Sequence, residues 1–257
     1  MADAARIGAK GGGEDKMKAL ILNSGRGTRL GELTERQPKA LTELEDGETI
    51  LGRQLRLLAQ AGLREVVITT GPFAEALEEY VRVQGLGLSY VFVPNPDYMS
   101  TNYIWSMELV GEALRGTDLL LMHGDLVFAR EVLEQVLGQQ RSVMAVSSTM
   151  ALPEKDFKAV LDGEGRIGKI GIEFFESAVA AQPLYKLRAA DWQVWQESIH
   201  RFVQTGRKNC YAENAFNKVA RRCELYACDI REMFCREIDT MEDLTEVKKE
   251  RSLWRDR

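Results

Sequence analysis

A short apolar run that passes directly into a glycine-rich loop constrains the fold of this 257-residue chain more than any other feature. The run covers residues 19–22 (ALIL), and its length and composition are typical of a buried parallel strand. The loop covers residues 23–29 (NSGRGTR), where two glycines allow a tight turn and let backbone amides approach a ligand. Its two arginines and the later Lys39 place fixed positive charge around the same turn. The stretch therefore predicts a site for a polyphosphate whose charge has to be spread during a reaction.

The bare pattern of this loop leaves a second interpretation open. Glycine-rich turns between a strand and a helix are common, and solvated arginines on such a turn need no ligand. The stretch also lacks the GK[ST] ending of a P-loop and the GxGxxG spacing of a dinucleotide-binding turn. A phosphate site and an ordinary turn both stay open at this point.

The composition of the chain excludes several classes of protein. With 45% apolar and 28% charged residues it is typical of a soluble globular protein, and its net charge of −5 provides no basic field for nucleic acid. No apolar run approaches the roughly 18 residues that span a bilayer, so we expect no membrane insertion. The four cysteines form no CxxC pair and the chain has two histidines, which argues against a zinc site. Reduced thiols and a cytoplasmic location are the expectation.

The first sixteen residues differ from the rest of the chain. They are small, glycine-rich and charged, and they lack the apolar core of a signal peptide. Met17 directly precedes the first strand. We therefore predict a disordered leader or an added extension at residues 1–16 and a single domain at residues 17–257, a length over which one large α/β core is common.

Strand and helix patterns alternate along most of the chain, which predicts right-handed βαβ units on a mostly parallel sheet. Ligands on such sheets bind beyond the carboxyl ends of the strands, so the loops after Leu22, Thr70, Val93 and His123 are expected to share one rim. A hairpin is predicted where two strand patterns flank Asp-Gly at residues 162–163. Residues 174–183 carry no clear pattern. The predicted strands are residues 65–70, 88–93, 118–122, 142–148, 157–161, 167–172, 225–228 and 234–238; the predicted helices are residues 49–62, 73–84, about 100–114, 131–137, 189–203, 211–219 and 241–250.

Two acidic residues stand where a metal ion is expected. Asp125 lies just past the buried strand 118–122, and Mg²⁺ in phosphate sites takes one or two carboxylates plus phosphate oxygens. Glu237 and Asp239 are two residues apart at the end of the last strand, so their side chains face the same side, and Asp239 becomes the partner of Asp125 on a shared Mg²⁺. Two alternatives stay open, a turn role for Asp125 and a helix N-cap at Asp239-Thr240. His123 is expected to pack beside the strand end.

The glycine-rich loop and the PKAL sequence at residues 38–41 resemble the signature of nucleotidyltransferases that join a nucleoside monophosphate to a phosphorylated acceptor. Asn23-Ser24 departs from the commoner Ala-Ala, but both residues are small enough for the turn. Four further stretches resemble one branch, the bacterial phosphocholine cytidylyltransferase-like enzymes, and the resemblance spans about residues 17–250. These stretches are NPDY (95–98), TNYIWS (101–106), GD (124–125) and EIDTMEDL (237–244).

The resemblance implies a Rossmann-like, mostly parallel central sheet flanked by helices, with a small β-hairpin and helical insertion that binds the acceptor. It implies a CTP-dependent cytidylyltransferase that uses Mg²⁺, transfers CMP to phosphocholine, phosphoethanolamine or 2-aminoethylphosphonate, and releases pyrophosphate. A sugar-1-phosphate nucleotidyltransferase and a non-catalytic nucleotide-binding module are the alternatives. A homodimer is compatible with the resemblance, and the sequence does not fix the oligomeric state.

The chemistry of such a reaction assigns roles to individual residues. We expect Arg29 to bind the triphosphate and the leaving group, and Lys39 to bind the α-phosphate and the attacking phosphate. The predicted nucleotide-binding residues are Leu22, Asn23, Ser24, Gly25, Arg26, Gly27, Thr70, Gly71, Thr101 and Asn102. The predicted acceptor-binding residues are Tyr103, Lys158, Trp192, Tyr211 and Glu213. A quaternary ammonium needs aromatic faces and an acid, and Lys158 on the hairpin is expected to reach the acceptor phosphate. Core packing for the aromatic residues, a solvated face for Lys158 and a plain helix N-cap at residues 100–102 are the competing interpretations.

Overall fold

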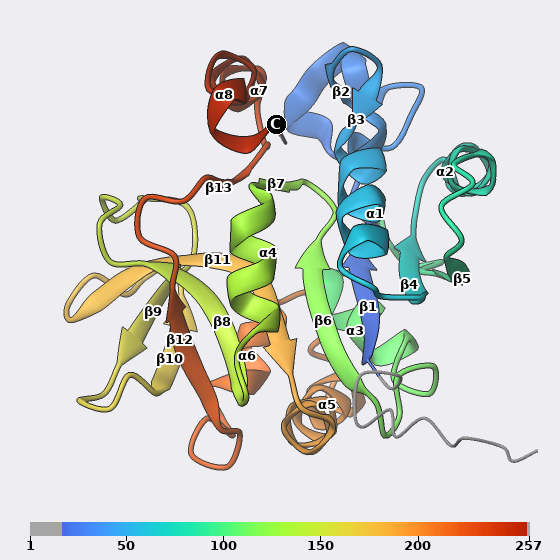
Figure 1. Ribbon diagram of the computed structural model, residues 1–257. Coiled ribbons are helices and arrows are strands. Elements are labelled where there is room, and N and C mark those ends of the chain that lie inside the picture. The colour runs from blue at the N-terminus through green and yellow to red at the C-terminus, as the bar shows by residue number, and fades with distance from the viewer. Residues whose placement is uncertain (1–16, 256–257) are drawn as a thin grey trace, which may run out of the picture.

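The computed structural model describes residues 17–255 and consists of a nine-stranded sheet with helices on both faces (Figure 1). Strand β1 lies at the centre and pairs in parallel with β4 on one side and β6 on the other. This arrangement confirms the predicted α/β fold with a mostly parallel central sheet. The strands of the sheet are β1 (Met17–Leu22), β4 (Glu65–Thr70), β5 (Ser89–Pro94), β6 (Asp118–His123), β8 (Ser142–Ser147), β9 (Lys158–Leu161), β10 (Ile167–Gly171), β11 (Ala178–Leu187) and β12 (Leu225–Asp229).

The sheet is mixed because of one long strand that the sequence pattern did not indicate. Strand β11 covers most of residues 174–183, which carried no clear pattern, and it pairs antiparallel with both β6 and β8. The predicted hairpin is present as β9 and β10, and β9 pairs with the first residues of β11. The predicted insertion is therefore an extension of the main sheet.

Two hydrophobic clusters, one on each face of the sheet, form the core. Alternate residues of β1 enter different clusters, Ala19 and Ile21 on one face and Leu20 and Leu22 on the other, because successive side chains of a strand point to opposite faces. The first cluster includes residues of α1 (Ile50–Gln60), α2 (Ala74–Val83), α4 (Arg130–Leu137), α7 (Met241–Lys249) and α8 (Arg251–Trp254). The second includes residues of α3 (Tyr103–Leu109), α5 (Ala189–Gln204) and α6 (Ala212–Phe216), and Figure 1 shows α1 and α4 in front of the sheet and α3 and α6 behind it.

Two of the predicted helices are shorter than expected. The helix predicted to continue to about residue 114 ends at Leu109, and the one predicted to continue to residue 219 ends at Phe216; both give way to turns. The other predicted helices are present with ends shifted by a few residues.

Several short elements connect the sheet to the loops at its carboxyl rim. The pair formed by β7 and β13 matters most, because its antiparallel register places Glu237 opposite Leu126, and Ile238 N donates to the carbonyl of Asp125 at 3.0 Å. The backbone thereby carries the two predicted acidic positions to the same place. These short elements are η2 (Thr28–Thr34), η3 (Lys39–Leu41), β2 (Glu43–Glu45), β3 (Glu48–Thr49), β7 (Leu126–Phe128) and β13 (Cys235–Glu237).

The predicted leader at residues 1–16 lies outside the described residues, and the single-domain interpretation of residues 17–257 stays a prediction. Among residues 17–255, no helix has the length and apolar character needed to cross a membrane.

Candidate active site

A cavity of about 390 Å³ opens at the carboxyl ends of β1, β5 and β6. Three of the loops predicted to share a rim line it, those after Leu22, Val93 and His123. The loop after Thr70 lies just outside, because Thr70 is 1% exposed and Gly71 packs on the carbonyl oxygen of Ser24. The cavity is lined by Leu22, Asn23, Ser24, Gly25, Arg26, Gly27, Thr28, Arg29, Lys39, Asn95, Tyr98, Thr101, Asn102, Tyr103, Ser106, His123, Gly124, Asp125 and Asp239. All predicted nucleotide-binding residues except Thr70 and Gly71 are in this set.

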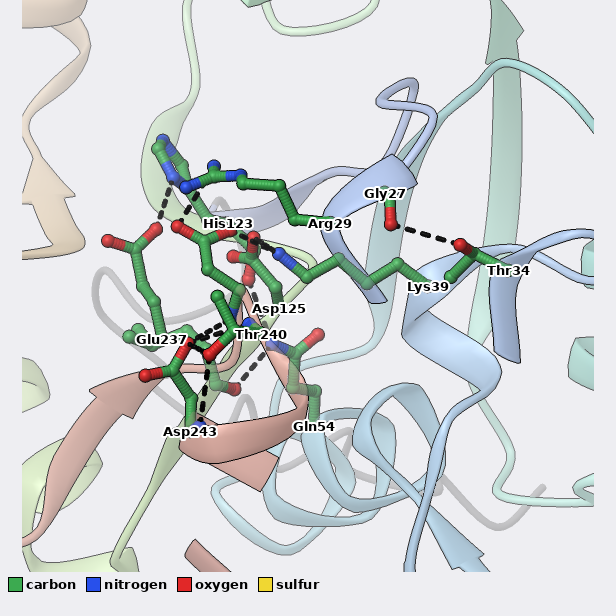
Figure 2. Close-up of polar contacts among 12 residues, drawn as sticks. Gly27, Arg29, Thr34, Lys39, Gln54, His123, Asp125, Glu237, Thr240 and Asp243 are labelled. Atoms are coloured by element: carbon green, nitrogen blue, oxygen red, sulfur yellow. Dashed lines mark hydrogen bonds and ion pairs between the residues drawn. The ribbon is translucent and has the colours of Figure 1, made fainter. Parts of the chain in front are cut away.

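The second glycine of the loop is required by the backbone and by a close contact. Gly27 has φ +64°, a left-handed conformation that L side chains rarely adopt, and a Cβ there would lie 2.9 Å from the Cβ of Lys39. The Gly27 carbonyl accepts a hydrogen bond from Thr34 Oγ1 at 3.0 Å, which Figure 2 shows beside the stem of Lys39. The loop and Lys39 are thus packed together as one unit.

The Lys39 ammonium lies between the two predicted metal ligands. Its Nζ donates to Asp125 Oδ2 and to Asp239 Oδ1, each at 2.6 Å, and Arg29 lies 3.0 Å from Asp239 Oδ2. The three side chains of the lysine bridge are 11–25% exposed. Burial disfavours the charged lysine, but the two carboxylates outweigh it and raise the pKa of Lys39. Burial likewise opposes ionisation of Asp125, and the charge of Lys39 lowers the pKa of that carboxyl below its ordinary value.

The donor set at this position fits a divalent cation. One oxygen of Asp125, Oδ1, is buried and has no hydrogen-bond partner among the described residues, so the carboxylate still has an unused acceptor. Carboxylate oxygens are the protein ligands that Mg²⁺ prefers. Thr240 provides the N-cap of α7, since its side chain accepts from Asp243 N, which leaves the Asp239 side chain free to point into the cavity.

His123 and Glu237 form an ion pair beside the acids, which the sequence reasoning did not predict. His123 Nδ1 lies 3.0 Å from Glu237 Oε1, as Figure 2 shows, and both side chains are less than 20% exposed. Burial opposes protonation of the imidazole, but the hydrogen bond and charge of Glu237 raise the pKa of His123 to about 9. Burial and the charge of Asp125 raise the pKa of Glu237 to about 7. His123 therefore lines the cavity as a cation. The sequence feature that could have indicated the role of Glu237 is its position two residues before Asp239.

Buried polar contacts that the sequence did not indicate fix the cavity wall near α3. Asn95 Nδ2 donates to Thr101 Oγ1 at 3.2 Å and to Ser106 Oγ at 3.1 Å, and Ser106 Oγ donates to Ser24 Oγ at 2.9 Å. The Asn102 side chain accepts from Tyr103 N at 2.7 Å, so it is the N-cap of α3, which confirms the N-cap expected at residues 100–102. The network joins the loop after β5 to the glycine-rich loop.

Three of the predicted acceptor-binding residues contact one another, and one of them, Tyr103, lines the cavity. Tyr103 lines the cavity, and its ring centroid is 5.9 Å from that of Tyr211 and 4.9 Å from that of His123. The Glu213 carboxylate is 1% exposed and accepts hydrogen bonds from the Tyr103 hydroxyl and, at 2.8 Å, from the Tyr185 hydroxyl. Burial and the charge of Glu213 raise the pKa of Tyr103 well above its ordinary value, so the phenol stays a donor.

The other two predicted acceptor-binding residues do not reach the cavity. Trp192 is 1% exposed and belongs to the hydrophobic cluster beneath α5, because its position on the helix faces the sheet. Lys158 is fully buried, and its ammonium donates to the carbonyls of Pro153 and Glu154 and lies 4.0 Å from the ring centroid of Phe175. Neither side chain lines the cavity, and the core packing that was the alternative for Trp192 is what the structure shows.

Known proteins with similar sequences include several nucleotidyltransferases. CMP-5'-(3-aminopropyl)phosphonate synthase from Streptomyces rubellomurinus is 34% identical over 149 residues, which are 58% of this chain and 23% of that protein. The 2-aminoethylphosphonate cytidylyltransferase from Lancefieldella rimae is 22% identical over 91% of this chain and 93% of its own length. Glucose-1-phosphate thymidylyltransferase from Neisseria meningitidis is 32% identical over 48% of this chain and 42% of its own length. The matches thus span less than half the length of the first and third of these proteins.

The fold is shared with a solved enzyme. The structure of CTP:phosphocholine cytidylyltransferase from Streptococcus pneumoniae superposes with a TM-score of 0.72 over 91% of this chain and 98% of that one, at 20% sequence identity. The family described as the MobA-like NTP transferase domain matches residues 19–192, more than half of the chain. The chain therefore belongs to the MobA-like NTP transferase domain family.

Proposed function

We propose that this chain is a CTP-dependent cytidylyltransferase that transfers CMP to a small amine-bearing phosphate or phosphonate and releases pyrophosphate. The acceptors that we propose are phosphocholine, phosphoethanolamine and 2-aminoethylphosphonate. The observation that carries the proposal is the convergence of Arg29, Lys39, Asp125 and Asp239 beside the glycine-rich loop. The choice of cytidine and of an amine-bearing acceptor rests on the similarity to the aminoalkylphosphonate enzymes.

The proposed reaction needs no protein base. The acceptor phosphate is already an anion at pH 7, since the second pKa of a phosphate monoester is near 6. One of its oxygens attacks the α-phosphorus of CTP, the bond from the α-phosphorus to the bridging oxygen breaks, and the electron pair leaves with pyrophosphate. Catalysis then reduces to in-line positioning of two polyanions and stabilisation of the moving charge.

The residues of the cavity divide this task. Backbone amides of residues 23–27 hold the nucleotide, Arg29 neutralises the departing pyrophosphate, and Lys39 draws the acceptor phosphate toward the α-phosphate. A Mg²⁺ held by Asp125 and Asp239 would neutralise charge on the α-phosphate when it is bound. The Asn95, Thr101 and Asn102 side of the cavity faces the cytosine in this proposal.

The acceptor amine lies against Tyr103 and Tyr211 in this proposal. The buried Glu213 is hydrogen-bonded to the hydroxyls of Tyr103 and Tyr185, so among the described residues no positive charge pairs with it directly. An ammonium group in front of two aromatic rings would supply that charge.

A sugar-1-phosphate nucleotidyltransferase is the second candidate, favoured by the similarity to the thymidylyltransferase. A non-catalytic nucleotide-binding module is less well supported, because binding alone does not require all four charged residues of the cavity.

Pyrophosphate release tests the proposal. CTP with 2-aminoethylphosphonate, phosphoethanolamine or phosphocholine is expected to support turnover, and CTP or dTTP with glucose-1-phosphate is not. The variant Asp125→Asn is expected to lose about 10²-fold or more in rate with an unchanged circular dichroism spectrum, while Glu164→Gln on the exposed hairpin turn serves as the matched control. Turnover with glucose-1-phosphate alone would favour the second candidate, and near-normal rates in Asp125→Asn would remove Asp125 from the mechanism.

A further inference from the structure

The contact between Lys39 and the two acids has a consequence for metal binding. We propose that Lys39 is a positioning residue of the metal site, whose ammonium holds Asp125 and Asp239 together without metal and is exchanged for the divalent cation when the nucleotide arrives. The inference rests on the proposed function only through the metal role of these two acids. Its test therefore uses neither nucleotide nor acceptor.

The geometry supports a lysine that occupies the space of a cation. The Nζ of Lys39 lies 2.6 Å from one oxygen of each carboxylate, so the two acids share a single positive centre. Mg²⁺ lies about 2.0–2.1 Å from its oxygen ligands. An ammonium and a magnesium ion therefore cannot occupy the same gap, and one has to leave when the other enters.

The alternative of leaving the gap empty is costly. Asp125 and Asp239 come from distant parts of the chain and are 20% and 25% exposed, so water screens their repulsion only in part. The second oxygen of Asp239 has Arg29 at 3.0 Å, whereas Oδ1 of Asp125 is buried without a partner among the described residues. Lys39 is thus the cation that contacts both acids. Asp125 Oδ1 remains as an acceptor that a metal ion can use.

The position of the Lys39 side chain beside the glycine-rich loop allows the exchange. Its stem passes beside Gly27 of the glycine-rich loop, where a Cβ would lie 2.9 Å from the lysine Cβ and 3.5 Å from its Cδ (Figure 2). The same ammonium can therefore turn from the acids to a phosphate held by that loop while its backbone stays in place. A triphosphate that binds together with a metal ion would supply both partners of the exchange. The ion would replace the ammonium between the two acids, and the phosphate would pair with the displaced ammonium.

Two consequences follow for metal binding without nucleotide. In the native chain the ion has to compete with an ammonium that two carboxylates hold, so binding is weak. In Lys39→Met, which keeps the stem and removes the charge, binding is expected to tighten by about tenfold or more because the competitor is gone. The variant also leaves two acids without their shared cation, so its thermal midpoint is expected to be lower and to rise more steeply with added metal.

The experiment measures Mn²⁺ binding to the full chain by electron paramagnetic resonance of free Mn²⁺, together with thermal midpoints at increasing Mn²⁺. Arg29→Met is the matched control, because it removes a positive charge next to Asp239 and leaves the lysine bridge intact; we expect a change below about threefold. Tighter Mn²⁺ binding in Lys39→Met than in both other proteins supports the proposal. Equal or weaker Mn²⁺ binding in a folded Lys39→Met overturns the proposal. Absence of Mn²⁺ binding in both the native chain and Lys39→Met also overturns it and removes the metal role of the two acids. The pyrophosphate assay tests the proposed function separately.

A second measurement keeps the proposal testable if Lys39→Met does not fold. Acetylation of lysines in the native chain, followed by mass spectrometry, is expected to modify Lys39 slowly without metal and several-fold faster with saturating Mg²⁺. Lys208, whose ammonium lies 3.8 Å from the ring centroid of Trp105, provides the internal reference. An unchanged Lys39 to Lys208 labelling ratio would overturn the exchange.

Discussion

At the scale of single residues, the two glycines of the loop differ although the sequence pattern treats them alike. Gly27 has φ +64° and touches the Lys39 stem, whereas a Cβ on Gly25 would meet no described atom within 4 Å and its φ lies outside the left-handed region. Only Gly27 is therefore required by conformation and space.

This difference predicts the outcome of a matched pair of substitutions. Gly27→Ala is expected to cost about 1–3 kcal/mol of unfolding free energy, because alanine resists a positive φ and its methyl displaces Lys39. Gly25→Ala is expected to stay within about 0.5 kcal/mol of the native chain. Urea unfolding measures both values. Equal costs for the two variants would contradict the assignment of Gly27 as the strained position.

The His123–Glu237 pair predicts a pH dependence of stability. The pKa of His123 is about 9 in the folded chain and 6.5 when unperturbed, so the folded state holds the proton more tightly. The stabilisation is complete below pH 6.5 and is lost as the pH rises toward 9, at most about 3 kcal/mol. The raised pKa of Glu237, about 7, acts in the same direction, and buried thiols such as Cys223, whose pKa burial raises to about 12, add to it from about pH 9, so only the difference from a His123 variant isolates the imidazole.

The measurement compares unfolding free energies at pH 7 and pH 9.5 in the native chain and in His123→Gln. We expect the native value to fall and the variant's value to change much less. A native chain whose stability is flat or rises over this interval would show that the imidazole is not held as a cation.

At the scale of secondary-structure elements, the start of α7 connects stability to the site. Thr240 and Asp243 form a reciprocal cap, and Asp243 Oδ2 also accepts from the backbone N of Asp239 at 2.9 Å. The cap therefore fixes the backbone that carries the Asp239 carboxylate.

Removing this cap is expected to lower stability and activity together. Thr240→Ala should lose about 1 kcal/mol and reduce the rate of pyrophosphate release, since Asp239 becomes less ordered. Thr245→Ala is the control on the same helix, because its exposed hydroxyl contacts only the Met241 carbonyl, and it should change stability by less than about 0.5 kcal/mol. If Thr240→Ala loses stability but keeps full activity, the cap does not position Asp239.

Element identity was largely predictable from local patterns, and the exception has a physical reason. Most strands here have continuous apolar runs because both of their faces are buried, which is a strong signal in the sequence. Strand β11 contains Pro183, which cannot donate a ladder hydrogen bond and therefore argues against a central strand. The structure accommodates it where the β11–β8 register shifts between Ala181 and Tyr185.

The site was predictable in its charged residues but not in their mutual contacts. The motif positions of Lys39, Asp125 and Asp239 predicted three participants in phosphate chemistry, and all three line one cavity. No local pattern encodes that an ammonium bridges residues 86 and 200 positions away along the chain. The burial of Trp192 was hard to predict for the same reason, since residue type alone does not reveal which helix face meets the sheet.

At the scale of the whole molecule, the C-terminal helices α7 and α8 are connected to α1 by buried contacts. Trp254 on α8 is 3% exposed, its Nε1 donates to the Val247 carbonyl at 2.8 Å, and the guanidinium of Arg53 on α1 lies 4.8 Å from its ring centroid. Arg53 also donates to the carbonyls of Phe128 and Trp254. One buried arginine thereby connects α1, β7 and α8. The hydrogen bond from Trp254 to Val247 connects the same residues to α7, which Asp239 precedes.

This long-range connection predicts that a substitution far from the cavity affects the whole fold. Trp254→Ala is expected to cost about 3–5 kcal/mol, because it opens a cavity beside a buried guanidinium and removes its aromatic neighbour. The adjacent Leu253→Ala should cost less than about 0.5 kcal/mol, since Leu253 is 58% exposed. Urea unfolding monitored by circular dichroism measures both values, and comparable midpoints for the two variants would mean that α8 is not part of the cooperative core. Because Asp239 precedes α7, a folded Trp254→Ala is further expected to release pyrophosphate more slowly than Leu253→Ala at equal concentrations of Mg²⁺ and CTP.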